Sequence, residues 1–365
     1  MEDGPAASPP RRGAAVSGER QATLRDVARA AGVSQATASR VLNGSIRNVR
    51  QGNAARVLAA AAELGYAPHL SAQAIARGST NTVALVVSGV DDPYFSSIAA
   101  GVTQAAEAAG LIVTMAVAGR SPERELQIVR TLRGMRPRAI ILTGSRIDGS
   151  DTRDALVEEF DAYRDAGGSV VLISQHDLPF RTVSIDDYGG ARQLARALAG
   201  LGYRRFAVVC AGGGLRTSRD RCGGFMDGLR EFDIDINEQR VVEAEFSRRG
   251  GCAAARELVR RGLDGTELVF AVSDVMAIGA MTAFRDAGLV PGQDVAVAGF
   301  DDIGPAVDVV PELTTVTVPL RQLGLRAMEL ALSDDDASRI VQVSTSVVLR
   351  GSTRRLPRPR ADDRG

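Results

Sequence analysis

The sequence has no lysine, no tryptophan, two histidines and three cysteines in 365 residues. The cysteines Cys210, Cys222 and Cys252 lack the paired spacing of a zinc site, and the histidines stand far apart in the sequence. These scarcities predict reduced thiols, no metal site and no cofactor. No apolar run reaches the ~18 residues that span a membrane, and residues 1–20 lack the hydrophobic core of a secretory signal. We therefore expect a cytoplasmic protein without a membrane partner.

Basic and acidic side chains are equally numerous, 44 of each, but they are unevenly distributed. Residues 1–80 carry ten arginines against five acids, and residues 350–365 carry six arginines against two. Residues 81–349 carry 28 arginines against 37 acids. A basic head on an acidic body predicts a nucleic-acid-binding segment joined to a body that need not touch phosphate. A merely solvated basic segment is the alternative that charge alone leaves open.

The basic head begins with the pattern of two short helices joined by a tight turn. Thr23 can cap the first helix, with Asp26 as the reciprocal carboxylate, and Gly32 permits the left-handed turn that ends it. Ser34 can cap a second helix over residues 35–42. Two such helices make a helix-turn-helix, whose second helix reads DNA.

A third helix is expected over Ala54–Leu64, where Asn53 would act as the N-terminal cap. Its predicted inner face consists of Val57, Leu58, Ala61 and Leu64.

The run T-L-R-D-V-A-R-A-A-G-V-S-Q-A-T-A-S-R-V-L-N-G resembles the DNA-binding head of the lactose-repressor (LacI/GalR) family. The resemblance implies that Gln35 and Ala36 open a recognition helix in the major groove, and Arg40 has the chemistry to bind guanine. It also makes residues 70–78 similar to the family hinge, where Ile75 would wedge into the minor groove, although a plain linker is the alternative. The implied DNA contacts are Thr23, Ser34, Gln35, Ala36, Thr37, Ser39, Arg40, Asn43, Arg56, Tyr66, Ala72 and Ile75.

The body alternates apolar strands with helices from Thr82 onward, and the alternation restarts near Tyr188. Repeated strand–helix units predict parallel sheets covered by helices, and two runs predict two α/β lobes with a ligand cleft between them. This pattern is similar to the periplasmic-binding-protein-like core of the same family. The expected fold is therefore an α-helical helix-turn-helix head plus a two-lobed α/β body with parallel sheets.

The expected organisation starts with a disordered leader and ends with a disordered tail. The segments are a leader at 1–21, a helix-turn-helix domain at 22–66, a hinge or linker at 67–80, an effector-binding and dimerisation domain at 81–352, and a tail at 353–365. Within the body, the N-lobe is expected at about 81–182 and 315–338, and the C-lobe at about 183–314 and 339–352.

The resemblance also implies a set of effector contacts in the cleft. They are Asp92, Tyr94, Phe95, Ser174, Arg221, Phe246, Ser273, Asp274 and Asp301. Ser174 and Ser273 stand where the family commonly has an acid or an amide, and one hydroxyl cannot replace a bidentate amide. This favours an effector smaller or less hydroxylated than a hexose, or one held through water. A phosphosugar, a nucleoside and an amino-acid-like effector stay open.

The implied function is that of a bacterial, cytoplasmic, sequence-specific transcriptional regulator that associates with the nucleoid when bound to its operator. The favoured form is a repressor controlled by a small effector, a sugar or sugar derivative, and it would bind a pseudo-palindromic double-stranded operator as a homodimer. A solute-binding receptor of the same two-lobed fold without a DNA role is the alternative, against which the head argues. An enzyme is not expected, because the loop after Ala211 lacks the G-x-G-x-x-G spacing of a dinucleotide site.

Overall fold

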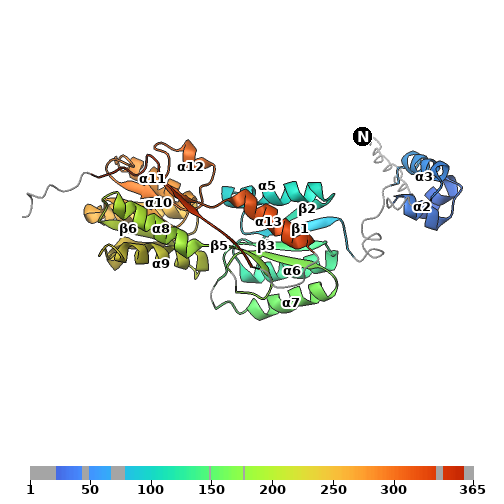
Figure 1. Ribbon diagram of the computed structural model, residues 1–365, viewed down its shortest axis with the longest axis horizontal. Coiled ribbons are helices and arrows are strands. Elements are labelled where there is room, and N and C mark those ends of the chain that lie inside the picture. The colour runs from blue at the N-terminus through green and yellow to red at the C-terminus, as the bar shows by residue number, and fades with distance from the viewer. Residues whose placement is uncertain are drawn as a thin grey trace, which may run out of the picture. The chain divides into compact units, whose positions relative to one another are not determined.

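The computed structural model divides into two compact units, Met1–Ala76 and Arg77–Gly365, which we describe separately (Figure 1). The described residues are 22–42, 49–66, 79–147, 149–175, 177–333 and 340–356. Within them, no helix is long and apolar enough to cross a membrane, and no group of three or more metal-ligating side chains gathers.

The head consists of three helices, α1 (Leu24–Ala30), α2 (Gln35–Leu42) and α3 (Gln51–Glu63). The predicted capping box is confirmed, since Thr23 N donates to Asp26 Oδ2 at 3.0 Å and Asp26 N donates to Thr23 Oγ1 at 3.4 Å. The predicted cap of α2 is confirmed too, because Thr37 N donates to Ser34 Oγ at 3.2 Å. Local capping therefore sets the start of both α1 and α2.

The start of α3 differs from the prediction. The helix begins at Gln51, and its N-cap Arg50 makes no side-chain cap bond. Asn53 is not the cap: its backbone N–H donates to Arg50 O at 2.8 Å, and its Oδ1 accepts from Arg56 Nη2 at 2.8 Å. Backbone bonding closes the first turn, so the helix needs no side-chain cap there.

The predicted inner face of α3 is only half right. Val57 and Ala61 are buried together with Ala60, whereas Leu58 and Leu64 are 56% and 41% exposed. The head core packs mainly through valines and alanines from the three helices, with Leu24 and Leu42 packed against it, whereas Leu58 and Leu64 remain exposed.

The N-lobe is built on a six-stranded parallel sheet in the order β11-β5-β4-β3-β1-β2. The strands are β1 (Thr82–Val87), β2 (Ile112–Val117), β3 (Ala139–Thr143), β4 (Ser169–Ile173), β5 (Arg181–Ile185) and β11 (Ile340–Val343). The helices are α5 (Pro93–Ala108), α6 (Pro122–Met135), α7 (Arg153–Asp165) and α13 (Leu320–Leu332). Val83, Leu85 and Val87 share a core with α5 and α13, whereas Ala84 and Val86 share one with α6 and α7. Alternate residues of β1 thus bury both faces of the sheet.

The C-lobe is built on a four-stranded parallel sheet in the order β7-β6-β8-β9. The strands are β6 (Phe206–Ala211), β7 (Val241–Ala244), β8 (Leu268–Ala271) and β9 (Ala296–Ala298). The helices are α8 (Asp187–Gly200), α9 (Arg216–Arg230), α10 (Arg248–Arg260), α11 (Asp274–Asp286) and the short α12 (Pro305–Asp308). Helix α8 packs against α9, and α10 packs against α11.

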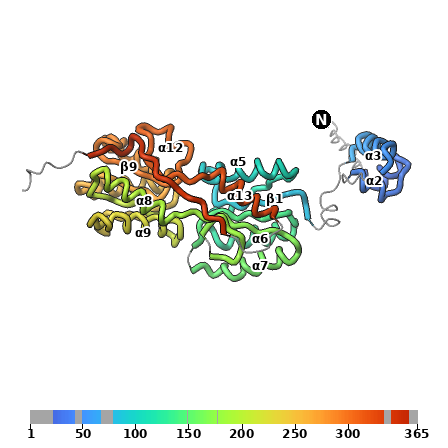
Figure 2. Tube along the Cα trace, viewed as in Figure 1, coloured from blue at the N-terminus to red at the C-terminus, as the bar shows by residue number. Residues whose placement is uncertain are grey.

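The chain crosses between the lobes three times, after β5, between β9 and α13, and after β11 (Figure 2). Strands β10 (Thr315–Thr317) and β12 (Ser346–Val348), on two of these crossings, pair antiparallel. The lobe boundaries predicted after residues 182 and 338 are wrong in detail, because β5 and β11 complete the N-lobe sheet. Both strands are only partly buried, so they lack the continuous apolar run that marks a central strand.

The described end of the chain is ordered against the C-lobe, contrary to the tail predicted from residue 353. Thr353 is 7% exposed and its Oγ1 lies 2.7 Å from Thr314 Oγ1. Leu356 N donates to Leu201 O at 2.9 Å. Residues 357–365 and the leader 1–21 lie outside the described residues.

The cysteines also differ from the prediction of three reduced thiols. Cys210 at the end of β6 and Cys222 in α9 form a disulfide, with their Cα atoms 6.4 Å apart, and Cys252 is free. The pairing follows from the packing of α9 on β6, which the spacing of twelve residues does not reveal.

The contact between α5 and α13 generates a stability prediction. A Cβ on Gly101 would lie 2.1 Å from Arg321 O, so Gly101→Ala should lower the free energy of unfolding by about 1–3 kcal/mol or more. Gly134→Ala is the matched control, since a Cβ there meets nothing within 4 Å and should stabilise helix α6 by roughly 0.5–1 kcal/mol. Urea unfolding measures both, and equal effects would contradict the packing.

Candidate functional site

The two lobes form a cleft at the carboxyl ends of the N-lobe strands, with about 550 Å³ of space when the open solvent at its mouth is included. Its N-lobe wall includes residues that directly follow β1, β3 and β4, namely Ser88, Gly144, Ser145, Ser174 and Gln175. Seven of the nine predicted effector contacts line it: Asp92, Tyr94, Phe95, Ser174, Arg221, Phe246 and Asp301.

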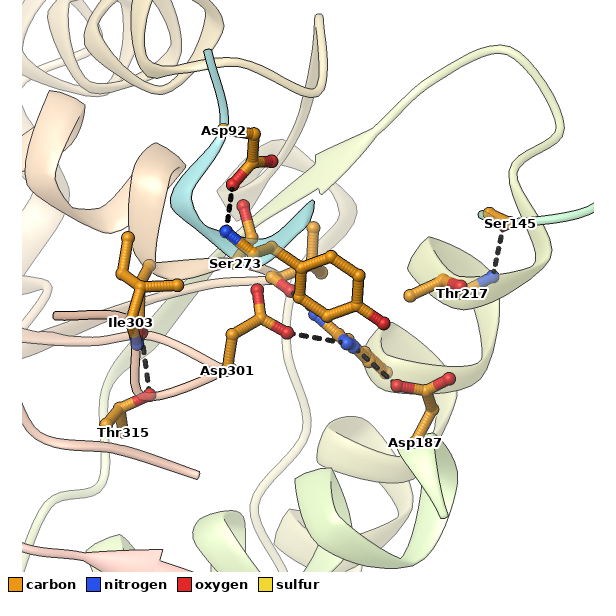
Figure 3. A network of polar contacts seen from close by, with 12 residues as sticks. Asp92, Ser145, Asp187, Thr217, Ser273, Asp301, Ile303 and Thr315 are labelled. Atoms are coloured by element: carbon orange, nitrogen blue, oxygen red, sulfur yellow. Dashed lines mark hydrogen bonds and ion pairs between the residues drawn. The ribbon is translucent and has the colours of Figure 1, made fainter. Parts of the chain in front are cut away.

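Arg221 of α9 is the centre of the cleft. Its side chain is 2% exposed, and Nε donates to Asp187 Oδ1 at 2.8 Å while Nη2 lies 2.8 Å from Asp301 Oδ1 (Figure 3). Nη1 donates to Val272 O at 2.7 Å, and the guanidinium carbon lies 3.9 Å from the centre of the Phe300 ring. A buried cation is tolerated here because two carboxylates and a carbonyl surround it.

Asp187 is a site residue that the sequence did not reveal. It is one of two adjacent aspartates, and nothing in the pair indicates which one faces the cleft. Asp186 caps α8, since its Oδ1 accepts from Gly189 N at 2.9 Å, and the following residue Asp187 then turns toward Arg221. The cap of a helix thus orients the carboxylate that follows it.

Asp301 has an unusual backbone conformation and a raised side-chain pKa. Its φ of 118° lies in the left-handed region that non-glycine residues rarely adopt, and its backbone N donates to Val316 O at 2.9 Å. Burial raises the pKa of Asp301 to about 7, against the lowering effect of Arg221. Backbone strain of this kind costs on the order of 1–3 kcal/mol and is concentrated at functional sites.

The N-lobe wall combines a helix cap with two aromatic rings. Asp92 Oδ1 accepts from Tyr94 N at 3.0 Å and so caps α5, and burial raises the pKa of Asp92. The Tyr94 and Phe95 rings lie edge to face with centroids 5.1 Å apart. Phe95 is only 5% exposed, so it serves the core and the cleft together. Ser174 Oγ donates to Gly144 O at 2.7 Å, which ties the ends of β3 and β4 together.

Ser273 and Asp274 do not line the cleft, contrary to the prediction. Ser273 Oγ accepts from Met276 N at 3.4 Å as the cap of α11. Asp274 accepts from Thr315 Oγ1 at 2.6 Å and from Ile303 N at 3.0 Å, and both residues are fully buried. Asp274 therefore secures a crossing segment to the C-lobe, and Ser273 carries no information on the size of the effector.

One side of the cleft is closed by contacts between the lobes. Thr217 N donates to Ser145 Oγ at 3.0 Å (Figure 3). Gln175 Nε2 donates to Thr217 Oγ1 at 2.7 Å. Ile147 and Leu215 form an antiparallel bridge beside them. Sequence reasoning missed these residues, because serine, threonine and glutamine in loops form no motif.

The DNA contacts predicted on the second helix of the head differ in exposure. Gln35, Ala36 and Arg40 of α2 are exposed, whereas Thr37 and Ser39 are half-buried. The remaining predicted DNA contacts differ in exposure, and three of them are not described. Thr23, Ser34 and Arg56 are exposed and Tyr66 is half-buried against the head core, while Asn43, Ala72 and Ile75 lie outside the described residues.

Comparisons with known proteins identify the family to which the chain belongs. Residues 23–69 match the model of the lacI family of bacterial regulatory proteins, and residues 195–353 match a periplasmic binding protein-like domain. The transcriptional regulator GalR of Escherichia coli (strain K12) is 33% identical over 326 residues, covering 88% of this chain and 92% of GalR. This chain belongs to the lacI family. It is therefore a DNA-binding transcriptional regulator and not an enzyme, as the sequence predicted.

Solved structures of lacI-family proteins share the fold. A lac repressor dimer bound to operator and the anti-inducer ONPF matches with a TM-score of 0.78 and 26% identity, covering 92% of this chain and all of that one. A CelR–cellobiose complex matches with a TM-score of 0.66 and 30% identity, covering 91% and 99%. The predicted helix-turn-helix head and two-lobed body with parallel sheets are thereby confirmed.

The pKa of Asp301 predicts a pH effect on stability. The folded carboxyl holds its proton more tightly than the unfolded one, whose pKa is about 3.8, so the wild type should lose stability relative to Asp301→Asn as pH rises from about 4 to 7. The relative change should be on the order of 3–4 kcal/mol, at ~1.4 kcal/mol per pKa unit. Urea unfolding at pH 4.5, 6 and 7.5 measures it.

Asp154→Asn is the control, because this side chain is 92% exposed and its loss should leave the pH dependence unchanged. Parallel stability curves for the wild type and Asp301→Asn would contradict the raised pKa.

Proposed function

We propose that the protein is a repressor whose operator affinity is set by a sugar or sugar derivative bound in the interlobe cleft. The observation that carries the proposal is the union, in one chain, of a capped helix-turn-helix head and a closed cleft centred on Arg221, Asp187 and Asp301. It would act in the bacterial cytoplasm, on the nucleoid. Two similar structures support the proposal: a CelR–cellobiose complex supports a sugar effector, and a lac repressor bound to operator supports DNA binding.

The chemistry of the cleft suits hydroxyl groups. Carboxylates accept hydroxyl protons, and a guanidinium donates to hydroxyl oxygens, so Asp187, Arg221 and Asp301 offer both partners within one small volume. The Tyr94 and Phe246 rings supply apolar surface for a sugar ring. We propose the seven lining residues among the predicted contacts, together with Asp187, as effector contacts.

The head would read DNA in the usual helix-turn-helix manner. Gln35, Ala36 and Arg40 are proposed to contact base edges, because they are the exposed residues of α2. The polar side chains around them would bind phosphates, which position the protein without specifying sequence. These are Thr23, Ser34, Thr37 and Ser39, with Asn43, Arg56, Tyr66, Ala72 and Ile75 as further predicted contacts.

The DNA-binding half is tested on an operator recovered from fragmented genomic DNA. Gln35→Ala and Arg40→Ala should each weaken binding by about 1–3 kcal/mol, or roughly 5- to 150-fold in Kd by fluorescence anisotropy. Arg29→Ala removes an arginine of α1 whose side chain is 72% exposed, and it should leave Kd within about twofold. Equal losses in all three variants would mean that α2 does not read the sequence.

A homodimer is proposed from apolar surface on both lobes. Strand β2 is an edge of the N-lobe sheet and exposes Ile112 and Met115, 56% and 46% accessible. Beside α12 in the C-lobe, Val307 and Val310 are 50% and 80% accessible. Edge strands and apolar patches of this kind are normally covered. In Figure 1, α5 beside β2 and α12 lie along the same upper side of the body, so one partner can cover both lobes.

The dimer is tested by sedimentation at micromolar concentration. Ile112→Glu/Met115→Glu should convert a dimer into a monomer and weaken binding to a palindromic operator, because charge would be buried at the contact. Met135→Glu introduces the same charge at a methionine that is 60% exposed at the end of α6, and it should remain dimeric. A monomeric wild type, or an unchanged double variant, would contradict the proposed interface.

A further inference from the structure

A second chamber adjoins the cleft, with about 730 Å³ of space when the open solvent at its mouth is included. It shares Ser88, Arg120 and Ser145 with the cleft and extends from them toward the first turns of α6 and α7. Arg216 of the C-lobe completes its wall. A ligand in the cleft would therefore lie against residues that also line the second chamber.

The second chamber carries an excess of positive charge. Four arginines line it, Arg120, Arg146, Arg153 and Arg216, against two acids, Glu125 and Asp177. Glu125 uses both oxygens on Arg146, at 2.7 Å each, and Asp177 Oδ2 lies 3.6 Å from Arg216 Nη1. Glu125 is thus committed to Arg146, whereas Asp177 is committed only through Oδ2, since its Oδ1 is buried without a hydrogen-bond partner among the described residues. Among the described residues, Arg120 and Arg153 have no carboxylate within hydrogen-bond distance.

Arg120 stands where the two cavities meet. Its φ of 57° is in the left-handed region, and its guanidinium lies 4.9 Å from the centre of the Phe246 ring of the opposite lobe. Its nearest carboxylate, Asp92, is 3.9 Å away, and burial lowers the pKa of Arg120 against the raising effect of Asp92, Asp91 and Glu245. A residue of positive φ that holds a partly desolvated cation between two cavities is the kind of arrangement found at ligand sites.

Two further features add positive potential to the second chamber. Thr152 makes no side-chain cap to α7, and although Arg153 N donates to Ser150 O at 3.2 Å, the positive end of the helix dipole adds to the potential here. Arg146 Nε is a buried donor without an acceptor among the described residues. A buried donor left unbonded requires an explanation, and a bound anion near Arg146 would supply the missing acceptor.

The cleft itself, unlike the second chamber, has no excess of positive charge. Arg221 is matched by Asp187 and Asp301, and Asp92 adds a third carboxyl group nearby, so no positive charge is in excess there. Hydroxyl groups suit the cleft, and an anion suits the second chamber. The two cavities thus favour different parts of one ligand.

We infer that the second chamber binds the anionic group, a phosphate ester or a carboxylate, of an effector whose hydroxylated body fills the cleft. Arginine forks match the geometry of both anions. The inference rests on the proposed function and narrows it to sugar phosphates and sugar acids, at the expense of neutral monosaccharides and nucleosides.

The first experiment uses the full-length protein and inorganic phosphate, with acetate as the carboxylate probe and chloride at matched ionic strength as the reference. Thermal unfolding is followed as each anion is titrated. Arg120→Gln/Arg153→Gln should raise the phosphate or acetate concentration for half-maximal stabilisation at least tenfold. The probe that responds distinguishes a phosphate site from a carboxylate site.

Two control variants accompany the titration. Arg124→Gln removes an exposed arginine of α6 that does not line the second chamber, and it should behave as the wild type. Arg120→Lys keeps the charge and should retain most of the response. Identical responses of the wild type and the double glutamine variant to both anions would overturn the inference.

The second experiment measures Kd by calorimetry for glucose, galactose and fructose, for their 6-phosphates, and for glucuronate and galacturonate. The inference requires that an anionic sugar bind at least tenfold more tightly than its neutral parent and that the double glutamine variant lose this preference. A neutral sugar that binds as tightly as its phosphate and its uronic acid would overturn the inference and leave the proposed function intact. A selective phosphate or acetate response without any sugar binding would count against the proposed effector and for the second chamber.

Discussion

The body of this protein depends on one buried cation. Arg221 is supplied by the C-lobe helix α9, and its two carboxylate partners come from segments at two of the crossings between the lobes. Asp187 begins α8 directly after the first crossing, and Asp301 precedes the second. Because an uncompensated charge in this position would cost several kcal/mol, both crossings must stay where their carboxylates can meet the guanidinium. The geometry of the cleft and the junction of the lobes are thus set by the same contacts.

The crossing segments are also held by hydrogen bonds and an ion pair of residues that do not line the cleft. Asp274 accepts hydrogen bonds from Thr315 and Ile303, and Asp302 pairs with Arg350 at 2.7 Å. These bonds tie the segment between β9 and β10 to α11 and to the end of the chain. A ligand that changes the charge balance at Arg221 therefore acts on segments that are already bonded to both lobes.

Local signals made much of the fold predictable. The caps of α1 and α2 are read directly from Thr23, Asp26 and Ser34, since each acts within three residues of its own position. The alternation of strands and helices likewise gave the two lobes, because buried parallel strands are short apolar runs. Strands β5 and β11 were not predicted, because their partly polar sequences resemble loops.

The cleft was predictable only in part. Arg221 and Asp301 stand in motifs, but Asp187 was hidden beside a capping aspartate, and Ser273 and Asp274 face the interior of the C-lobe. Whether a side chain at a strand end faces the cleft or the core depends on helix caps and crossing segments that are distant in sequence. The second chamber was invisible for the same reason, since its arginines come from four separate loops and helices.

The disulfide between Cys210 and Cys222 has a consequence for how the cleft can adapt. Cys222 follows Arg221 on α9, so the covalent bond fastens that turn of the helix to the end of β6. The helix can then neither slide nor rotate on its sheet without carrying the strand along. The disulfide therefore makes the C-lobe side of the cleft rigid. We expect the N-lobe loops to move when ligands of different shape bind.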